Sequence, residues 1–229
     1  MHSSTRNPIV MIAGASGLVG GCALQQLLAQ PSIQQVYSLT RRAANQPHPK
    51  LIECVDTNLS MTEWDENQPR PTHGVIALGT TLKQAGSPQA LEKIDFDLVC
   101  HVAQTMKILG VSRLAVVSSY GANPTSRSHY LRCKGRMEET IRRQGFEQVT
   151  FVRPGPLKGQ RKESRQNEIW LQRVMQIGRF FLFGRLKNLI PIEAERVAQA
   201  MLYQLFDYSD QRITILHSQD MHHMLQKYQ

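Results

Sequence analysis

Four polar side chains have the types and spacing of a site that moves a proton to or from an oxygen atom. Ser118 and Ser119 end an apolar run, and Tyr130 and Lys134 follow four residues apart at the start of a predicted helix, so the tyrosine and the lysine share one helix face. A tyrosine, with an ordinary pKa of about 10, is a poor acid near neutrality. A nearby ammonium lowers that pKa, and a serine hydroxyl can stabilise a developing oxyanion. The set indicates proton donation to a carbonyl oxygen during hydride addition, with the lysine also able to hold a nicotinamide ribose.

These side chains must be positioned by an alternation of strands and helices. The apolar runs predict strands at 9–13, 36–40, 51–55, 74–78, 114–117 and 149–152, and helices at 18–30, 88–109 and 130–144. Such alternation is typical of βαβ units and gives a parallel sheet with helices on both faces. The sequence therefore predicts an α/β fold, a doubly wound Rossmann-type sheet formed by one domain over residues 1–229. Its core spans 8–155, and 156–229 form a short extension on the substrate side.

Within that extension, two segments have a helical pattern and one resembles a strand. Residues 194–206 predict an amphipathic helix that closes the fold, and 212–216 predict one more strand. Residues 169–183 combine apolar side chains with arginines; this pattern fits a helix packed on the core better than one lying on an anionic membrane. The rest of the tail after residue 207 has little pattern.

A glycine-rich loop joins the first predicted strand to the first predicted helix. Gly14 permits a tight turn, Gly17 lets backbone approach a pyrophosphate, and Gly20 lets helix and strand pack closely. Phosphates would bind the free N–H groups where this helix begins, around Ser16, Leu18 and Val19. The alternative is a purely structural turn, but the position between a strand and a helix favours nucleotide binding.

The end of the second predicted strand favours NADP(H) over NAD(H). An NAD site usually has an acidic residue there, whereas this chain has Arg41 and Arg42, which can form forked hydrogen bonds with a ribose 2′-phosphate. The alternative is a solvated arginine pair. Asp56 ends the third strand, where contacts with the adenine edge are common. The fourth strand ends in a further group of cofactor-binding candidates: Leu78, Gly79 and Thr80.

The order of motifs along residues 9–205 resembles the short-chain dehydrogenase/reductase superfamily, and within it the atypical Tat-interacting-protein-like oxidoreductases. The motifs are Gly14-Ala15-Ser16-Gly17, Leu39-Thr40-Arg41-Arg42, Ala77-Leu78-Gly79-Thr80-Thr81, Ser118-Ser119-Tyr120-Gly121-Ala122, Tyr130-Leu131-Arg132-Cys133-Lys134-Gly135, Phe151-Val152-Arg153-Pro154-Gly155 and Arg161-Lys162-Glu163-Ser164-Arg165. The resemblance implies a Rossmann fold, NADP(H) binding and a catalytic set of Ser119, Tyr130 and Lys134. It implies that Pro154 lies beside the nicotinamide. Ser118 is an alternative site serine, and it is expected to contact the cofactor together with Tyr130 and Lys134.

Composition limits the alternatives. The chain has 229 residues and four scattered cysteines, which fit a reducing compartment and predict a cytoplasmic protein. It lacks an apolar run long enough to span a membrane. His217, His222 and His223 lie near the terminus without supporting ligands, so a solvated tail is favoured and no metal is predicted.

The net charge of +9 is concentrated in one region. Residues 127–187 hold 15 Lys and Arg against 5 Asp and Glu, which fits a solvated face, an anionic ligand, an acidic surface or nucleic acid. Residues 153–168 form a long connection without clear secondary structure, which has two interpretations. It is either a lid over the substrate, whose cations favour an anionic substrate, or a mobile loop whose charges only keep it soluble. The cations are Lys158, Arg161, Lys162 and Arg165.

Two functions follow from the sequence. The first is an NADP(H)-binding oxidoreductase that transfers hydride to a small carbonyl-type substrate. The second is an NADP(H)-binding regulatory or sensor protein that acts through protein partners with little turnover. The complete set of Ser119, Tyr130 and Lys134 favours the first. No nucleic-acid-binding motif is present, and the helix at 88–109 would serve equally in a monomer or a homodimer.

Overall fold

Seven parallel strands form one sheet in the structure, a computed structural model that describes residues 7–44, 47–61, 63–158 and 189–227. Along the sheet the strands have the order β3-β2-β1-β4-β5-β6-β9. Their bounds are β1 Ile9–Ala13, β2 Gln35–Thr40, β3 Leu51–Val55, β4 His73–Ile76, β5 Arg113–Val117, β6 Gln148–Arg153 and β9 Ile213–His217. A separate pair, β7 Leu157–Lys158 and β8 Ile192–Glu193, is also parallel.

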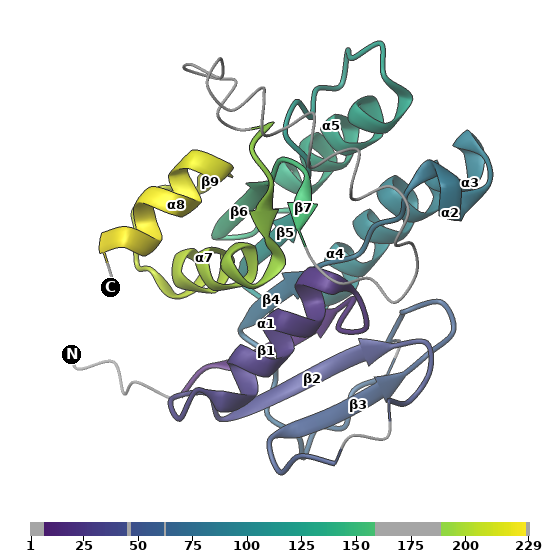
Figure 1. Ribbon diagram of the computed structural model, residues 1–229. Helices are drawn as coiled ribbons and strands as arrows, with labels where there is room; N and C mark the ends of the chain where they lie inside the picture. Colours follow the sequence, from purple (N-terminus) through teal and green to yellow (C-terminus); the bar gives the residue numbers. More distant parts are fainter. Residues whose placement is uncertain (1–6, 45–46, 62, 159–188, 228–229) are drawn as a thin grey trace.

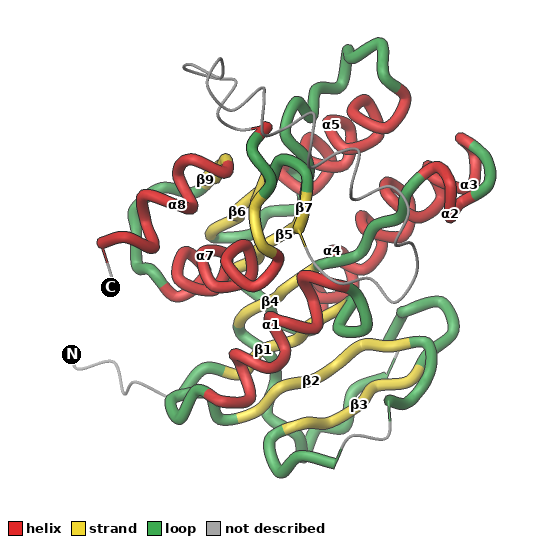
Figure 2. Tube along the Cα trace, viewed as in Figure 1, coloured by secondary structure: helices red, strands yellow, loops and turns green. Residues whose placement is uncertain are grey.

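Helices cover both faces of this sheet (Figures 1 and 2). One face carries α1 Leu18–Ala29 and α7 Ala194–Phe206, with α8 Ser218–Lys227 packed beside α7. The other face carries α4 Val99–Ile108 and α5 His129–Arg142. Two short helices, α2 Leu82–Ala85 and α3 Pro88–Glu92, precede a π-helical segment, η1 Lys93–Leu98, that runs into α4.

Burial on both faces explains why the strands are apolar throughout. In β1 all five residues are buried. Val10 and Ile12 pack into the cluster with α1 and α7, whereas Met11 and Ala13 pack into the cluster with α4 and α5. Successive strand residues point to opposite faces, so a two-sided sheet requires an unbroken apolar run.

The position of β1 in the sheet locates the ligand crevice. β1 pairs with β2 on one side and β4 on the other, so the chain winds outward in both directions from this point. Ligands of open α/β sheets bind at the carboxyl ends of the strands beside such a reversal. The predicted Rossmann-type α/β fold is confirmed, and the residues at the ends of β1, β4 and β5 share this crevice.

The structure corrects two details of the sequence prediction. The helix expected at 88–109 is instead a succession of α3, η1 and α4. The strand predicted at 212–216 is confirmed as the edge strand β9, but the rest of the tail, expected to have little pattern, forms the helix α8, whose Met221 and Leu225 are buried. The segment 169–183 and the cations of the expected lid beyond Lys158 lie outside the described residues. Within the described part, no helix is long and apolar enough to cross a bilayer.

Candidate functional site

A cavity of about 630 Å³ lies at the carboxyl ends of β1, β4, β5 and β6. Three segments that are far apart in the sequence meet there: the start of α1, the end of β4 and the start of α5. The predicted site residues that line it are Gly17, Leu18, Val19, Leu78, Gly79, Thr80, Ser118, Ser119, Tyr130, Lys134 and Pro154. The predicted residues outside its lining are Gly14, Ser16, Gly20, Arg41, Arg42 and Asp56.

The glycine loop closes tightly between β1 and α1. Gly14 has a φ of +92°, and a Cβ there would lie 2.6 Å from the Ala77 carbonyl oxygen. A Cβ on Gly20 would lie 2.0 Å from the Gly14 carbonyl oxygen. The Gly17 N–H donates to that same oxygen at 2.9 Å. These contacts leave no space for side chains, so the backbone itself forms the wall.

The beginning of α1 is suited to an anion. Its N-cap residue, Gly17, has no side chain to accept a hydrogen bond from the first turn, and Gly17, Leu18 and Val19 line the cavity. The unpaired N–H groups and the positive end of the helix dipole therefore lie at this side of the cavity. A glycine cradle joined to a helix N-terminus fits a dinucleotide pyrophosphate.

The predicted ribose and adenine residues lie at the ends of β2 and β3. Arg41 and Arg42 are exposed directly after β2. The Oδ1 atom of Asp56 accepts from the backbone N–H groups of Asn58 and Ser60, both at 2.9 Å. The Asp56 carboxylate thus fixes the turn that follows β3, and the arginine side chains are available to a ligand.

The first two turns of α5 carry Tyr130 and Lys134 into the cavity. Ser128 caps the helix with a hydrogen bond from the Leu131 N–H. A Cβ on Gly135 would lie 2.2 Å from the Asn123 carbonyl carbon, so this glycine lets α5 press against the loop that follows β5. Tyr130 and Lys134 line the same cavity as the glycine loop.

Lys134 is buried and paired with an acidic residue that the sequence analysis missed. Its Nζ lies 2.8 Å from Asp95 Oδ1, and the two side chains are 3% and 1% exposed. Burial is the largest influence and lowers the pKa of Lys134, but Asp95 together with Tyr130 and Glu138 outweighs it, so the pKa of Lys134 is raised. The signal was an aspartate within the apolar helical pattern at 88–109, which predicts an acidic residue on a buried face.

The two adjacent serines have different partners. The Ser118 hydroxyl donates to Glu138 Oε1 at 2.6 Å. Ser119 has a longer hydrogen bond, from its hydroxyl to the Tyr120 carbonyl oxygen at 3.4 Å. Ser118 is buried whereas Ser119 is partly exposed, so the Ser119 hydroxyl is the more accessible of the two.

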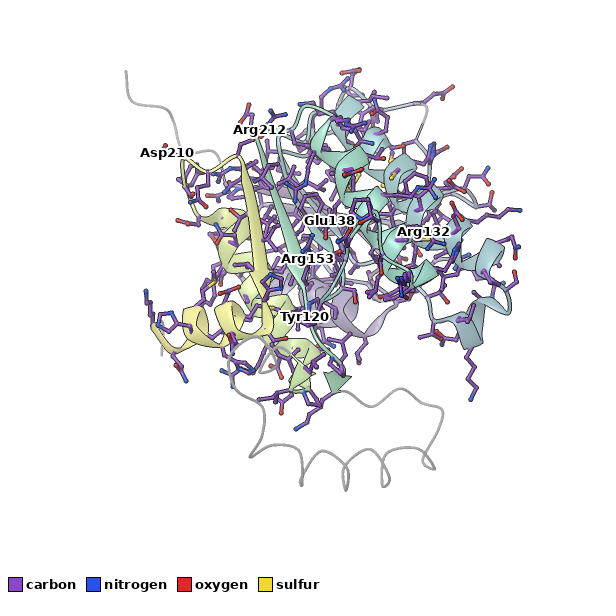
Figure 3. All side chains as sticks on the ribbon, turned by 90° about the horizontal axis from the view of Figure 1, so that it is seen from above. Tyr120, Arg132, Glu138, Arg153, Asp210 and Arg212 are labelled. Carbon is purple, nitrogen blue, oxygen red and sulfur yellow. The ribbon has the colours of Figure 1, made fainter. Side chains whose placement is uncertain are left out.

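Glu138 joins three of the elements around the cavity. Arg153, at the end of β6, donates to Glu138 from Nε at 2.8 Å and from Nη2 at 2.6 Å. This forked pair joins α5 to the end of β6, and Figure 3 labels both Glu138 and Arg153. The hydrogen bond from Ser118, the residue after β5, joins α5 to a second strand end. The network fixes the backbone that carries Ser119 and Pro154.

One group with metal-ligating side chains occurs in the described part of the chain. Glu92, His129 and Cys133 have ligand atoms within 4.8 Å of one another. Both ring nitrogens of His129 already have polar neighbours, since Nε2 lies 3.1 Å from the Pro88 carbonyl oxygen and Nδ1 lies 3.2 Å from Arg132 Nη2. The contacts of His129 do not test the sequence expectation that no metal is bound, which stays a prediction.

The fold and the cavity define a nucleotide-binding α/β protein of the Rossmann class. The model of the NAD(P)H-binding family matches residues 14–207, and the chain belongs to that family. Its relatives include the mitochondrial protein fmp52 of Emericella nidulans, 36% identical over 69% of this chain and 71% of the relative. The mitochondrial protein FMP52 of Saccharomyces cerevisiae is 35% identical over 69% of each chain.

Solved structures share the same fold. A putative NAD-dependent epimerase/dehydratase from Bacillus halodurans is 19% identical, with a TM-score of 0.64 over 96% of this chain and 99% of the other. MoeE5, solved in complex with UDP-glucose and NAD, is 15% identical, with a TM-score of 0.62 over 90% of this chain and 74% of the other.

The comparisons refine one sequence prediction and overturn another. They support the NAD(P)H-binding family, and the relatives described above carry the name Fmp52 rather than that of a Tat-interacting protein. The predicted cytoplasmic location is wrong, because these relatives are named as mitochondrial proteins. Unpaired cysteines indicate a reducing compartment but do not say which one.

Proposed function

We propose that this protein is an NADPH-dependent reductase of a small carbonyl compound, similar to the Tat-interacting-protein-like oxidoreductases. The observation that carries the proposal is one cavity lined by the glycine loop, by Ser119 and by the pair Tyr130 and Lys134. The glycine cradle fits the pyrophosphate of the dinucleotide. When bound, NADPH supplies the hydride that reduces the carbonyl carbon.

The side chains around the cavity would handle the carbonyl oxygen and its proton. Tyr130 donates its hydroxyl proton to that oxygen as negative charge develops on it. Ser119 donates a hydrogen bond to the same oxygen and orients it. Lys134 holds the nicotinamide ribose, and Pro154 limits the space beside the nicotinamide. Ser118 supports this arrangement through Glu138.

Cofactor choice would depend on the ends of β2 and β3. Arg41 and Arg42 are exposed there, and we propose that they bind the 2′-phosphate of NADPH through charge-assisted hydrogen bonds. Asp56 holds the turn beside the adenine, and Ser16 lies in the loop next to the phosphates.

The described rim of the cavity favours an apolar substituent on the substrate. Leu157 and Leu189 line the cavity and are 38% and 41% exposed. Lys134 is the only lysine or arginine among the described lining residues, and its charge is already paired with Asp95. The described lining thus offers no unpaired cation to the anionic substrate considered from the sequence.

The test is the consumption of NADPH with a panel of aldehydes and ketones. We expect turnover that is strongest for substrates with an apolar substituent, and Tyr130→Phe should abolish it while the Kd for NADPH stays within about twofold, because the phosphate contacts lie elsewhere. Turnover that survives Tyr130→Phe would contradict the assignment of the proton donor. A wild-type protein that binds NADPH without reducing any substrate would contradict the reductase.

A further inference from the structure

The ion pair between Lys134 and Asp95 is buried beneath the cavity and held from several sides. Asp95 Oδ1 contacts the lysine at 2.8 Å, and Asp95 Oδ2 accepts the backbone N–H of Thr80 at 2.9 Å. The Lys134 ammonium also donates to the Val117 carbonyl oxygen at 3.4 Å. The pair therefore connects the ends of β4 and β5 with α5 and η1.

The backbone is shaped to bring the aspartate to this place. Asp95 lies in the π-helical segment η1, and π-helical turns inside α-helices are frequent at functional sites. A Cβ on Gly79 would lie 3.1 Å from Asp95 Oδ1 and 3.5 Å from Lys134 Nζ. Glycine at this position leaves the pair in contact with the cavity.

The charges around Lys134 are few and can be named. Asp95 faces it from η1, and Tyr130 and Glu138 lie one turn away on either side in α5. Glu138 is itself paired with Arg153 from β6. The nearest compensating charge is therefore the Asp95 carboxylate, and a lysine paired at 2.8 Å exerts a weaker positive field on a neighbouring hydroxyl than an unpaired one.

We propose that Asp95 is a positioning residue that fixes the Lys134 ammonium and offsets its charge, so that Tyr130 faces the carbonyl oxygen as a proton donor. This inference rests on the proposed function. It differs from an arrangement in which an unopposed lysine favours the tyrosinate. Hydride and proton still enter together: the carbonyl gains a C–H and an O–H bond, the cofactor is oxidised, and solvent returns a proton to Tyr130.

The test follows the ionisation of Tyr130 by NMR of the full-length protein with ¹³C-labelled tyrosine, the signal being assigned with Tyr130→Phe. In Asp95→Asn the lysine loses its partner, and we expect the pH midpoint of the Tyr130 signal to fall by about one unit or more. The matched control is Glu92→Gln, because the Glu92 carboxylate pairs with Arg136 rather than with Lys134. The pH midpoint of the Tyr130 signal should not move in this control. An unchanged or raised midpoint in folded Asp95→Asn overturns the proposal.

A second variant covers the case in which Asp95→Asn does not fold because it leaves a buried charge unpaired. Asp95→Asn combined with Lys134→Met removes both charges together. If the pair is effectively neutral, the Tyr130 midpoint stays within about 0.5 unit of the wild-type value. A larger rise shows that the lysine acts unopposed in the wild type and overturns the proposal. The NMR signal needs no substrate, so a protein without turnover refutes the reductase while this proposal is tested separately.

Discussion

Gly20 provides a sharp test of the cofactor cradle, because an added methyl group would meet backbone rather than a side chain. In Gly20→Ala the new Cβ would lie 2.0 Å from the Gly14 carbonyl oxygen, whereas ordinary contacts begin at 3.4 Å, so α1 and the loop must separate by 1.4 Å. Overpacking of this kind costs about 1–3 kcal/mol of unfolding free energy. Loss of one hydrogen bond to a phosphate, worth about 1.5–3 kcal/mol, raises the Kd for NADPH about 10- to 150-fold.

Gly21→Ala is the matched control, since it makes the same change in the same helix. A Cβ there would lie 3.3 Å from the Ala15 carbonyl oxygen, so a small adjustment suffices, and the gain in helix propensity of about 1 kcal/mol is common to both variants. Urea unfolding followed by circular dichroism and calorimetric titration with NADPH measure the two effects. If the unfolding free energies of the two variants agree within about 0.5 kcal/mol and both bind NADPH equally well, the close-packed cradle is refuted.

Three further predictions concern the cofactor, the serines and acid stability. Replacing both Arg41 and Arg42 with alanine should remove any preference for NADPH over NADH in calorimetry, and a retained preference would contradict their assignment to the 2′-phosphate. Ser119→Ala should reduce kcat with little change in stability, whereas Ser118→Ala should cost about 1.5–3 kcal/mol of unfolding free energy because its partner is a buried carboxylate; the reverse pattern would exchange their roles. Burial and a nearby arginine lower the pKa of His73 from 6.5 to about 4, so the unfolded chain takes up this proton first and stability falls as pH drops from 6.5 toward 4. Between pH 7 and pH 4.5, the free energy of unfolding of His73→Leu should therefore fall by about 2–3 kcal/mol less than that of the wild type. Equal decreases in the two proteins would show that His73 is not buried as a neutral group.

Local signals were sufficient to predict the central sheet and its glycine loop. Strands such as β1 are apolar at every position because both faces are covered, and Gly14, Gly17 and Gly20 mark a place where backbone must pack against backbone. These features depend on neighbours in the sequence.

The partners of the buried charges could not be predicted in the same way. Asp95 and Lys134 are 39 positions apart in the sequence, and they meet where the π-helical segment η1 packs against α5. Similarly, the choice between Ser118 and Ser119 depends on Glu138 in α5, whose hydrogen bond requires the packed helix. Residues 218–227 looked unpatterned because a short helix buries only part of its surface.

The most direct test of the central proposal is a calorimetric titration of the full-length protein with NADPH, repeated with NADH. We predict one NADPH bound per chain, with a Kd at least about tenfold lower than that for NADH, as expected for one extra charge-assisted contact with a phosphate. Binding that is equally tight for the two cofactors would contradict the assignment of the arginines after β2. No heat of binding for either cofactor at concentrations up to about 1 mM would contradict the cofactor site itself.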